Sequence, residues 1–516
     1  MIKELYLVLS PKASSEIKSS TSFIADQLGV EAKRINGVEI EKKSIDARKK
    51  DVKINVWLKV YIDESLPEKT FDYHYLNVTD KTPVLVVGAG PAGLFAALRL
   101  IELGFKPIVI ERGKTVSERK RDLAKINRSH IVDPDSNYAF GEGGAGTFSD
   151  GKLYTRSKKR GNVRRVLDIL TLHGADPEIL VDTHPHIGTN KLPRIIQSIR
   201  QRIIESGGEV HFQHRVDDFI IENQQIIAVK ANGKVFEGKA VVLATGHSAR
   251  DIYYLLHDKS IQIEAKEFAM GVRVEHPQSL IDSIQYSCTI RDEYLPAASY
   301  SLVTQVENRG VYSFCMCPGG FIVPASTGPE EIVVNGMSPS KRDSKYANSG
   351  MVVQITQDDL KEYAAEGVLA GLKFQQELEH LAFINGGGGQ IAPAQRLDDF
   401  INNKLSKNLP STSYHPGIIS SPLHFWLPDG IRERLQKGFL AFGRKLRGYI
   451  HHDAVIIGVE SRTSSPVRIP RDKDLLNHQQ ITNLFPAGEG AGYAGGIVSA
   501  AVDGERVAEQ IANLIR

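Results

Sequence analysis

The sequence predicts an α/β protein in which three layers are built around a parallel sheet. Three observations predict this class. Residues 84–112 read as strand, glycine-rich turn, helix and second strand, and residues 483–511 repeat a strand, glycine-rich turn and helix at the other end of the chain. Residues 216–237 alternate apolar and polar side chains around short polar turns, as a β-meander does.

The first turn carries the spacing of a dinucleotide-binding motif. A buried strand over Val84–Val87 runs into Gly88, Gly90 and Gly93, which form G-x-G-x-x-G at the start of a helix. The first glycine permits the tight turn, the second lets backbone amides approach a pyrophosphate, and the third lets the helix lie close to the sheet. The helix N-terminus favours an anionic ligand. The candidate ligand residues of this turn are Gly88, Gly90, Pro91, Ala92 and Gly93.

The second strand of this unit, Pro107–Ile110, ends in Glu111 and Arg112. A carboxylate about 20 residues after the glycines can hold a ribose 2′-hydroxyl. Both residues are therefore candidate ligands. An acid at position 111 argues against a 2′-phosphate, and this motif alone leaves NAD and FAD open.

The C-terminal block Asn483–Ile497 resembles the FAD domain of the glutathione-reductase-type flavoproteins, in which a late strand ends in Gly-Asp beside the ribityl chain. Here the pair is Gly488-Glu489, and the following helix start resembles the part that faces the flavin pyrimidine edge. The resemblance implies FAD rather than NAD. It implies contacts from Gly488, Glu489, Ala494, Gly495, Gly496 and Ile497.

Two further segments agree with that resemblance. Ala240–Gly246 is a strand ending in Ala244, Thr245 and Gly246, which resembles the family's third-strand motif. Glu209–Phe212 is a strand before it, and Val216 resembles the place where a backbone group meets the adenine. These segments extend the predicted FAD site.

The glycine-rich segment Gly141–Thr155 admits more than one interpretation. Gly146-x4-Gly151-Lys152 has P-loop spacing, but Leu153 stands where a P-loop needs Ser or Thr, and no convincing strand precedes it. A loop over the flavin and pyrophosphate is the preferred interpretation, and a plain surface loop is the alternative. The residues expected nearest the cofactor are Gly143, Gly144, Thr147 and Ser149.

Over nearly its whole length the chain resembles the bacterial family of uncharacterised FAD-dependent, or NAD(FAD)-utilising, dehydrogenases. The resemblance implies a flavoprotein and carries no known substrate. It rests on the segments 44–50 (SIDARKK), 141–153, 314–320 (FCMCPGG), 346–353 (YANSGMVV), 458–469 (GVESRTSSPVRI) and 483–497.

Composition agrees with this class. The chain has 516 residues and a net charge of +3, so a charge-driven nucleic-acid or membrane function is not expected. Three cysteines do not make a disulfide framework, which favours the cytoplasm. The apolar run Leu5–Leu9 is too short for a signal peptide or a spanning helix.

The pattern of elements predicts three bodies. Residues 1–80 read as a small α+β (βαββ) module, with strands or helices at Glu4–Leu9, Ser15–Leu28, Val38–Lys43 and Lys53–Ile62. Residues 84–250 and 455–516 form the FAD-binding domain. Residues 251–454 form an inserted β-rich α+β domain that covers the flavin and supplies the substrate site.

The N-terminal module carries the basic run Arg48-Lys49-Lys50. Such a run is normally a solvated turn, so nucleic acid is not the expected partner. Two alternatives from other functional classes stay open. One is an RNA-modifying or RNA-associated flavoenzyme that this module recruits to RNA, and the other is a flavin-bound interaction protein without turnover. The oligomeric state does not follow from the sequence.

In the inserted domain, the sequence predicts strands at 303–305, 312–315, 321–324 and 332–335. A helix is predicted over Glu366–Phe383, with Glu377, Glu379 and His380 on its polar side. Ile431–Ile450 predicts a basic amphipathic helix packed on the core, with a membrane or anion surface as the alternative. No second dinucleotide motif follows a strand. If NAD(P)H is the transient electron donor of the flavin, it must therefore dock without a Rossmann domain of its own.

The chain contains several side chains with reactive or titratable groups. On a strand, the thiols of Cys315 and Cys317 share one face, and we expect two structural thiols, with a flavin-facing thiol as the alternative. No metal site is predicted. Acid–base or substrate-orienting candidates are His247, His451, His452, Arg462 and Arg468, and no catalytic residue is assigned among them. The resulting hypothesis is an FAD-dependent oxidoreductase that binds FAD non-covalently, transfers hydride through flavin N5 and acts on a small-molecule substrate.

Overall fold

Five parallel strands form the central sheet of the computed structural model, which describes residues 1–67, 71, 73–155 and 161–515. Their order is β21-β10-β4-β5-β6, and every neighbouring pair is parallel. Both faces of the sheet are covered, and the strand residues 84–87, 241–243 and 484–486 are accordingly apolar and buried. The strands are β4 (Pro83–Val87), β5 (Lys106–Ile110), β6 (Glu209–His211), β10 (Val241–Leu243) and β21 (Leu484–Pro486).

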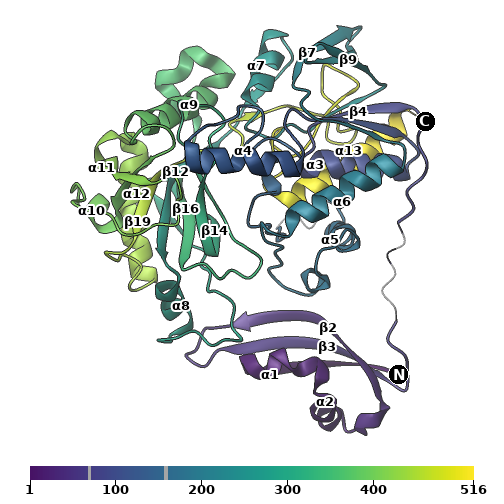
Figure 1. The fold of residues 1–516 in the computed structure, drawn as a ribbon, viewed down its shortest axis with the longest axis vertical. Helices are drawn as coiled ribbons and strands as arrows, with labels where there is room; N and C mark the ends of the chain where they lie inside the picture. The colour runs from purple at the N-terminus through teal and green to yellow at the C-terminus, as the bar shows by residue number, and fades with distance from the viewer. Residues whose placement is uncertain (68–70, 72, 156–160, 516) are drawn as a thin grey trace.

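Helices cover one face of this sheet and a β-meander covers the other (Figure 1). Residues Val84 and Val86 face the helical layer, whereas Leu85 and Val87 pack with the meander. The predicted three-layer α/β fold with a meander is therefore confirmed. The helical layer contains α3 (Pro91–Glu102), α5 (Val163–Leu172), α6 (Leu192–Glu205) and α13 (Ile497–Ile515), and the meander consists of β7 (Val216–Glu222), β8 (Gln225–Ala231) and β9 (Lys234–Glu237).

Helices α3 and α13 pack in direct backbone contact although they come from opposite ends of the chain (Figure 1). A Cβ at Gly504 would lie 2.0 Å from the carbonyl oxygen of Ala92. Because no side chain fits there, this glycine lets the two helices approach each other closely. The contact brings the beginnings of both helices to the same edge of the sheet.

The inserted domain is built on a second, mostly antiparallel sheet. Its strand order is β13-β14-β16-β12-β19-β17-β18, with β15 paired to β14. The strands are β12 (Phe268–Pro277), β13 (Val303–Val306), β14 (Arg309–Pro324), β15 (Val334–Met337), β16 (Tyr346–Ile355), β17 (Ala392–Arg396), β18 (Ile418–Ser420) and β19 (Val455–Glu460). Residues 455–460, which we expected to begin the second FAD-domain segment, pair with β12 and β17 in this sheet. The chain re-enters the parallel sheet only at β21.

Two long helices support the inserted sheet. Helix α9 (Ala370–Ile384) contacts β17 and β19, and α12 (Asp429–Lys445) contacts β12, β13, β14 and β16. The apolar side chains Ile431, Leu435, Phe439 and Phe442 of α12 are buried. This burial agrees with the packed amphipathic helix predicted there.

The smaller helices connect these layers. They are α4 (Val116–Ser129), α7 (Arg250–Asp258), α8 (Gln278–Tyr286), α10 (Leu397–Ile401) and α11 (Leu423–Trp426), and a short strand pair joins β11 (Glu264–Ala265) to β20 (Val467–Arg468). Among the helices of the described part of the chain, none is long and apolar enough to cross a membrane.

The N-terminal module forms a three-stranded antiparallel sheet of order β1-β3-β2. It contains β1 (Ile2–Leu9), β2 (Ile35–Asp46), β3 (Lys53–Ile62), α1 (Pro11–Ser15) and α2 (Thr21–Leu28). The helical segment that we predicted as continuous over 15–28 is broken at Ser20, which has ψ +51°. The module also touches the FAD-binding domain, because the Lys43 carbonyl accepts hydrogen bonds from the Thr183 amide and hydroxyl.

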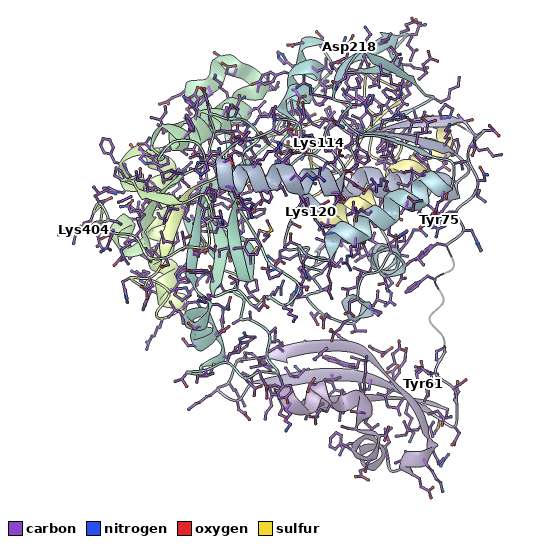
Figure 2. The ribbon with its side chains drawn as sticks, in the orientation of Figure 1. Tyr61, Tyr75, Lys114, Lys120, Asp218 and Lys404 are labelled. Carbon is purple, nitrogen blue, oxygen red and sulfur yellow. The ribbon has the colours of Figure 1, made fainter. Side chains whose placement is uncertain are left out.

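The segment after the module runs along the FAD-binding domain. Tyr73 and Tyr75 pack on the helical layer, where the guanidinium groups of Arg165 and Arg202 lie over their rings at 4.7 and 5.8 Å. Tyr75 is labelled in Figure 2. These cation–π contacts hold residues 73 and 75 against the helical layer.

Candidate functional site

A cavity of about 390 Å³ opens between the carboxyl ends of the parallel strands and the inserted domain. Ligands bind at this edge in open α/β sheets. The FAD-binding domain contributes glycine-rich turns from both ends of the chain. The inserted domain contributes side chains, namely Phe314, Cys315, Asn335, Arg462 and Thr463.

Two helix N-termini meet at the cavity. Gly90 is the N-cap of α3, and Gly495 and Gly496 precede α13. A Cβ at Gly495, Gly496 or Gly246 would meet no described atom within 4 Å, and one at Gly90 would only reach the Gly144 Cα at 4.0 Å. These four glycines therefore leave open the space that side chains would fill. The unfilled cradle and the two helix N-termini fit the pyrophosphate of a dinucleotide.

The other glycines of the first motif hold the turn itself. Gly88 has φ +104°, and a Cβ there would lie 2.4 Å from the Ala244 carbonyl oxygen. A Cβ at Gly93 would lie 1.9 Å from the Gly88 carbonyl oxygen. Gly88, Pro91 and Ala92 line the cavity, whereas Gly93 is outside its described lining.

Glu111 organises the turn through three backbone amides. Its Oε2 accepts from Ala89 at 2.8 Å, and its Oε1 accepts from Gly113 at 2.9 Å and Gly141 at 3.0 Å. Both Glu111 and Arg112 line the cavity. The Oε2 atom receives one of these bonds and so has capacity for a further donor such as a ribose hydroxyl.

Arg112 is held in place by acidic and aromatic neighbours. It donates to Asp135 and Asp251 at 2.8 Å each, and its guanidinium lies 4.1 Å from the centre of the Phe140 ring. Its charge is therefore balanced by two carboxylates at the mouth of the cavity. Val216 lies in the same lining, with Ala244 and Thr245.

The loop 141–152 closes over the first turn. Gly144 and Ser149 line the cavity, whereas Gly143 and Thr147 lie behind its described lining. The Gly143 amide donates to the Ala89 carbonyl at 2.9 Å, and the Thr147 hydroxyl donates to the Glu142 carbonyl at 2.7 Å. Gly143 and Thr147 thus shape the loop.

Lys152 lines the cavity as well, although its sequence position suggested only the P-loop spacing of Gly146-x4-Gly151-Lys152. It forms a β-bridge with His186 rather than opening a helix. Its ammonium donates to the Met316 carbonyl of the inserted domain. The lysine therefore connects the glycine-rich loop to the opposite wall.

The C-terminal turn places Gly488 and Glu489 in the cavity, and Ala494 lies just outside the described lining. The Gly488 amide donates to Asp503 at 2.9 Å, and Arg471 also binds this carboxylate. Burial raises the pKa of Glu489 to about 7, and a negative charge on Cys315 acts in the same direction.

His247 also faces the cavity, with its Nε2 3.7 Å from Glu489 Oε2. Burial lowers the pKa of His247 to about 4, assisted by the positive charges of Arg462 and Arg250. The imidazole is consequently neutral at neutral pH, so it can exchange hydrogen bonds there without carrying charge.

A buried ion network stands at the inserted-domain end of the cavity. Glu379 accepts from both Arg250 and Arg462, with distances of 2.7 and 2.8 Å to Arg250 and 2.8 Å to Arg462 Nη2. Arg462 Nη2 also donates to Glu331 at 2.7 Å. The charges of these four described side chains cancel. Arg462 is therefore held in a fixed position at the cavity, and the network as a whole adds no net charge there.

The placement of Glu379 differs from the sequence expectation. We expected Glu379 on the polar face of a helix, but its side chain is 0% exposed. The periodicity of α9 could not reveal this, because the partner arginines come from distant segments. The pKa of Glu379 lies well below its ordinary value, since the two arginines outweigh the opposing effect of burial.

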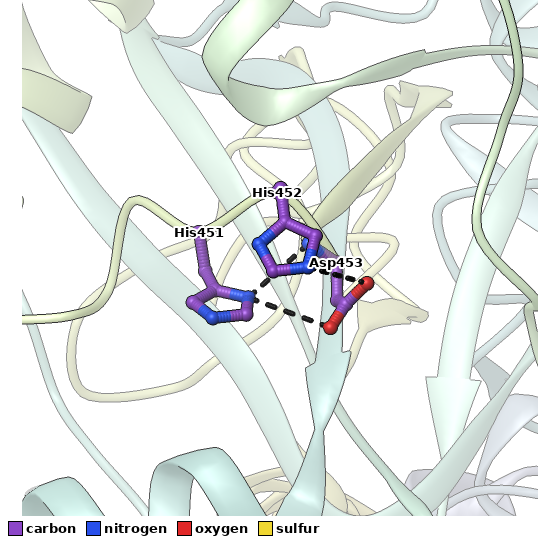
Figure 3. Close-up of side chains that lie close together, drawn as sticks. All are labelled: His451, His452 and Asp453. Carbon is purple, nitrogen blue, oxygen red and sulfur yellow. Dashed lines mark hydrogen bonds and ion pairs between the residues drawn. The ribbon is translucent and has the colours of Figure 1, made fainter.

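Other sequence candidates lie elsewhere. Arg468 is exposed and pairs in the short strand β20. His451 and His452 form a cluster with Asp453 in the turn before β19, where the His452 Nε2 and Asp453 Oδ1 atoms are 3.3 Å apart (Figure 3). The described lining of the cavity includes none of these residues.

Comparisons with known proteins agree with this geometry. Residues 81–229 match a family described as FAD binding domain, residues 267–463 match "FAD-dependent protein, C-terminal domain-like", and residues 1–61 match a domain of unknown function. An uncharacterised protein of Clostridium beijerinckii is 41% identical over 508 residues, covering 95% of this chain and 94% of that protein.

Two more distant likenesses are partial or weak. A thiamine thiazole synthase of Aeropyrum pernix is 28% identical over 192 residues, covering 34% of this chain and 59% of that protein. A solved structure of a geranylgeranyl bacteriochlorophyll reductase-like protein from Thermoplasma acidophilum is 14% identical, covers 84% of this chain and 78% of its own, and has a TM-score of 0.34.

Proposed function

We propose that this chain, which belongs to the same family as the uncharacterised Clostridium beijerinckii protein and matches an FAD-binding domain, is an oxidoreductase that holds FAD non-covalently in the cavity between its two main domains. FAD is the cofactor of this protein. When bound, the flavin supplies two-electron hydride chemistry at N5. The proposal rests on one observation, the open glycine cradle formed by Gly90, Gly246, Gly495 and Gly496.

The turn residues would bind the cofactor mainly through backbone groups. The α3 N-terminus at Gly90 and Pro91 would hold the pyrophosphate, and Glu111 would orient the ribose. The α13 N-terminus at Gly496 and Ile497 would stabilise negative charge on the reduced ring. The remaining proposed contacts are Ala92, Arg112, Gly144, Ser149, Val216, Ala244, Thr245, Gly488 and Glu489.

We also propose the glutathione-reductase-type arrangement for this FAD domain. Support comes from the parallel sheet, whose outer strand β21 returns from the end of the chain, and from the meander β7–β9 inserted before β10. The inserted domain covers the opposite side of the cavity and would supply the site for a small-molecule substrate. A cytoplasmic location is proposed because all three cysteines are free thiols.

The proposal is tested by isolating the protein and recording its visible spectrum. We expect a yellow protein that releases FAD on denaturation, and whose flavin absorbance bleaches when NADH or NADPH is added without oxygen. Bleaching by one nucleotide identifies the donor. A colourless protein that cannot be reconstituted with FAD contradicts the proposed site, and a flavin that stays oxidised with both nucleotides contradicts the proposed role of NAD(P)H.

A further inference from the structure

The cavity wall contributed by strand β14 is irregular at two cysteines. The pairing of β14 with β16 is interrupted between Phe314 and Cys317, and Cys315 has φ +44°, in the left-handed region. Such a bulge re-aims side chains. In a regular strand both thiols would share a face, whereas here Cys315 lines the cavity and Cys317 is 0% exposed behind it.

The two thiols are nevertheless held together. The Cys317 thiol donates to the Cys315 carbonyl oxygen at 3.2 Å, so it is turned back toward its neighbour. Arg273 Nη2 donates to the same carbonyl at 2.8 Å and lies 3.6 Å from Cys317 Sγ. One buried guanidinium therefore fixes both residues.

Cationic side chains lie close to Cys315. Nearby, Arg342 binds Asp150 at 2.9 Å and Arg273 binds Glu460 at 2.7 Å, and Glu489 is a third acid in the same cavity. The Lys152 ammonium lies as close to the Cys315 sulfur as to the Asp150 carboxylate, at 3.9 Å each, so it is placed to stabilise a thiolate at Cys315.

The acidities of the two thiols separate accordingly. A hydrogen bond between the two thiol groups, followed by the charges of Lys152 and Arg273, holds the pKa of Cys315 well below its ordinary value against the effect of burial. The neighbouring Cys315 and burial raise the pKa of Cys317. These directions favour a thiolate at Cys315 and a protonated thiol at Cys317, and the geometry places the first in the cavity wall and the second behind it, as in an attacking and a resolving cysteine.

We propose that Cys315 and Cys317 form a redox-active dithiol that exchanges two electrons with the flavin. In the forward step a bond forms between the two sulfur atoms and the S–H bond of Cys317 breaks. The two electrons and that proton pass to oxidised FAD, giving the anionic reduced flavin and an intramolecular disulfide. The negative charge lost by the Cys315 thiolate is the charge gained by the flavin, so the step is balanced. This inference rests on the proposed function, and Lys152 is its positioning residue.

The test is a thiol count on the full-length, FAD-containing protein. Samples equilibrated in glutathione redox buffers are denatured in an excess of alkylating reagent and weighed by mass spectrometry. Of the three cysteines, we expect only Cys288 to be alkylated under oxidising conditions and all three after treatment with dithiothreitol. Anaerobic reduction should consume four electrons per flavin, because the flavin and the disulfide are each two-electron couples.

Matched variants test whether the cysteine pair is the second two-electron redox couple. C315S and C317S should each consume two electrons per flavin, whereas C288S should still consume four and show no alkylated thiol when oxidised. Lys152→Met should slow alkylation of Cys315 at pH 7 by roughly tenfold, as expected from a smaller thiolate fraction, and Lys152→Arg should restore it. An unchanged alkylation rate in Lys152→Met would contradict the positioning role.

Three alkylated thiols in every buffer, together with two electrons per flavin, would overturn the dithiol. In that outcome the bound and reducible flavin still supports the proposed function. A protein that binds no FAD would instead overturn the proposed function, and the thiol count would still report on the cysteine pair.

Discussion

The two walls of the cavity are built by different means. The wall from the FAD-binding domain contains a backbone cradle, with glycines at the starts of α3 and α13. The wall from the inserted domain consists of side chains held by buried ions, including Cys315 and Arg462. The comparison teaches that a backbone cradle depends on the absence of a Cβ, whereas the side-chain wall depends on charge balance between distant segments. Substitutions should therefore damage the two walls in different ways.

The largest effect is expected at the centre of the side-chain wall. Glu379→Gln removes the carboxylate shared by Arg250 and Arg462 and leaves two buried guanidinium groups opposite Glu331 alone. Because uncompensated buried charge is costly, the free energy of unfolding should fall by about 3–5 kcal/mol. Chemical denaturation followed by circular dichroism measures the change.

Glu377→Gln is the matched control on the same helix. Its side chain is 51% exposed and accepts a hydrogen bond from Tyr363. Exposed interactions of this kind contribute about 1 kcal/mol or less. Equal losses of stability in the two variants would show that the wall does not depend on the shared carboxylate.

The next effect concerns the backbone wall and separates binding from folding. Gly90 has φ −77°, which valine adopts readily, and a Cβ there projects into the cavity. Gly90→Val should therefore fold but bind FAD roughly 100-fold or more weakly, equivalent to about 2.7 kcal/mol. Flavin fluorescence titration measures the affinity, and unfolding measures the stability.

Gly430→Ala provides the comparison for that variant. Gly430 lies in the first turn of α12, and a Cβ there would meet only the flexible Arg434 side chain at 3.3 Å. FAD affinity should stay at the wild-type value. Full flavin occupancy in Gly90→Val would contradict the assignment of this cradle to the pyrophosphate.

Low pH should destabilise the inserted domain by protonating a buried histidine. His276 is 0% exposed, its Nε2 contacts the Tyr449 carbonyl oxygen at 2.8 Å, and burial lowers its pKa to about 4. In the unfolded chain the pKa of His276 is about 6.5, so acid protonates the unfolded state first. The stability that the neutral ring contributes is therefore fully present above pH 6.5 and is lost as the pH falls toward 4.

The difference between two proteins isolates this contribution. Between pH 7 and pH 5.5 wild type should lose about 1 kcal/mol more unfolding free energy than His276→Gln. Urea denaturation at both pH values provides the measurement. Parallel losses in the two proteins would assign the acid sensitivity to other groups.

The backbone wall could be predicted from sequence because its requirements are local. Gly88, Gly90 and Gly93 keep fixed spacing around one turn, and the sheet and meander follow from short apolar and alternating runs. Each feature depends on neighbours along the chain, so a single sequence contains the information.

The side-chain wall could not be predicted in the same way. The partners of Glu379 are more than 80 residues away, at Arg250 and Arg462, and its helix position looks polar in sequence. The bulge that turns Cys315 into the cavity interrupts an apparently regular strand. Lys152 occupies a glycine-rich segment, where only its neighbours in space identify it as part of the wall.

The smallest effect is expected at a histidine pair that belongs to neither wall. The side chain of His452 is 69% exposed and contacts Asp453 and the ring of His451 (Figure 3). His452→Ala should therefore change the unfolding free energy by less than about 0.5 kcal/mol and leave FAD affinity at the wild-type value.

His247→Ala is the contrasting variant, because the His247 ring lies in the cavity beside Glu489 and its removal should alter the bound-flavin spectrum. A spectral change of equal size in His452→Ala would place this cluster in contact with the site and would break the division between the two walls.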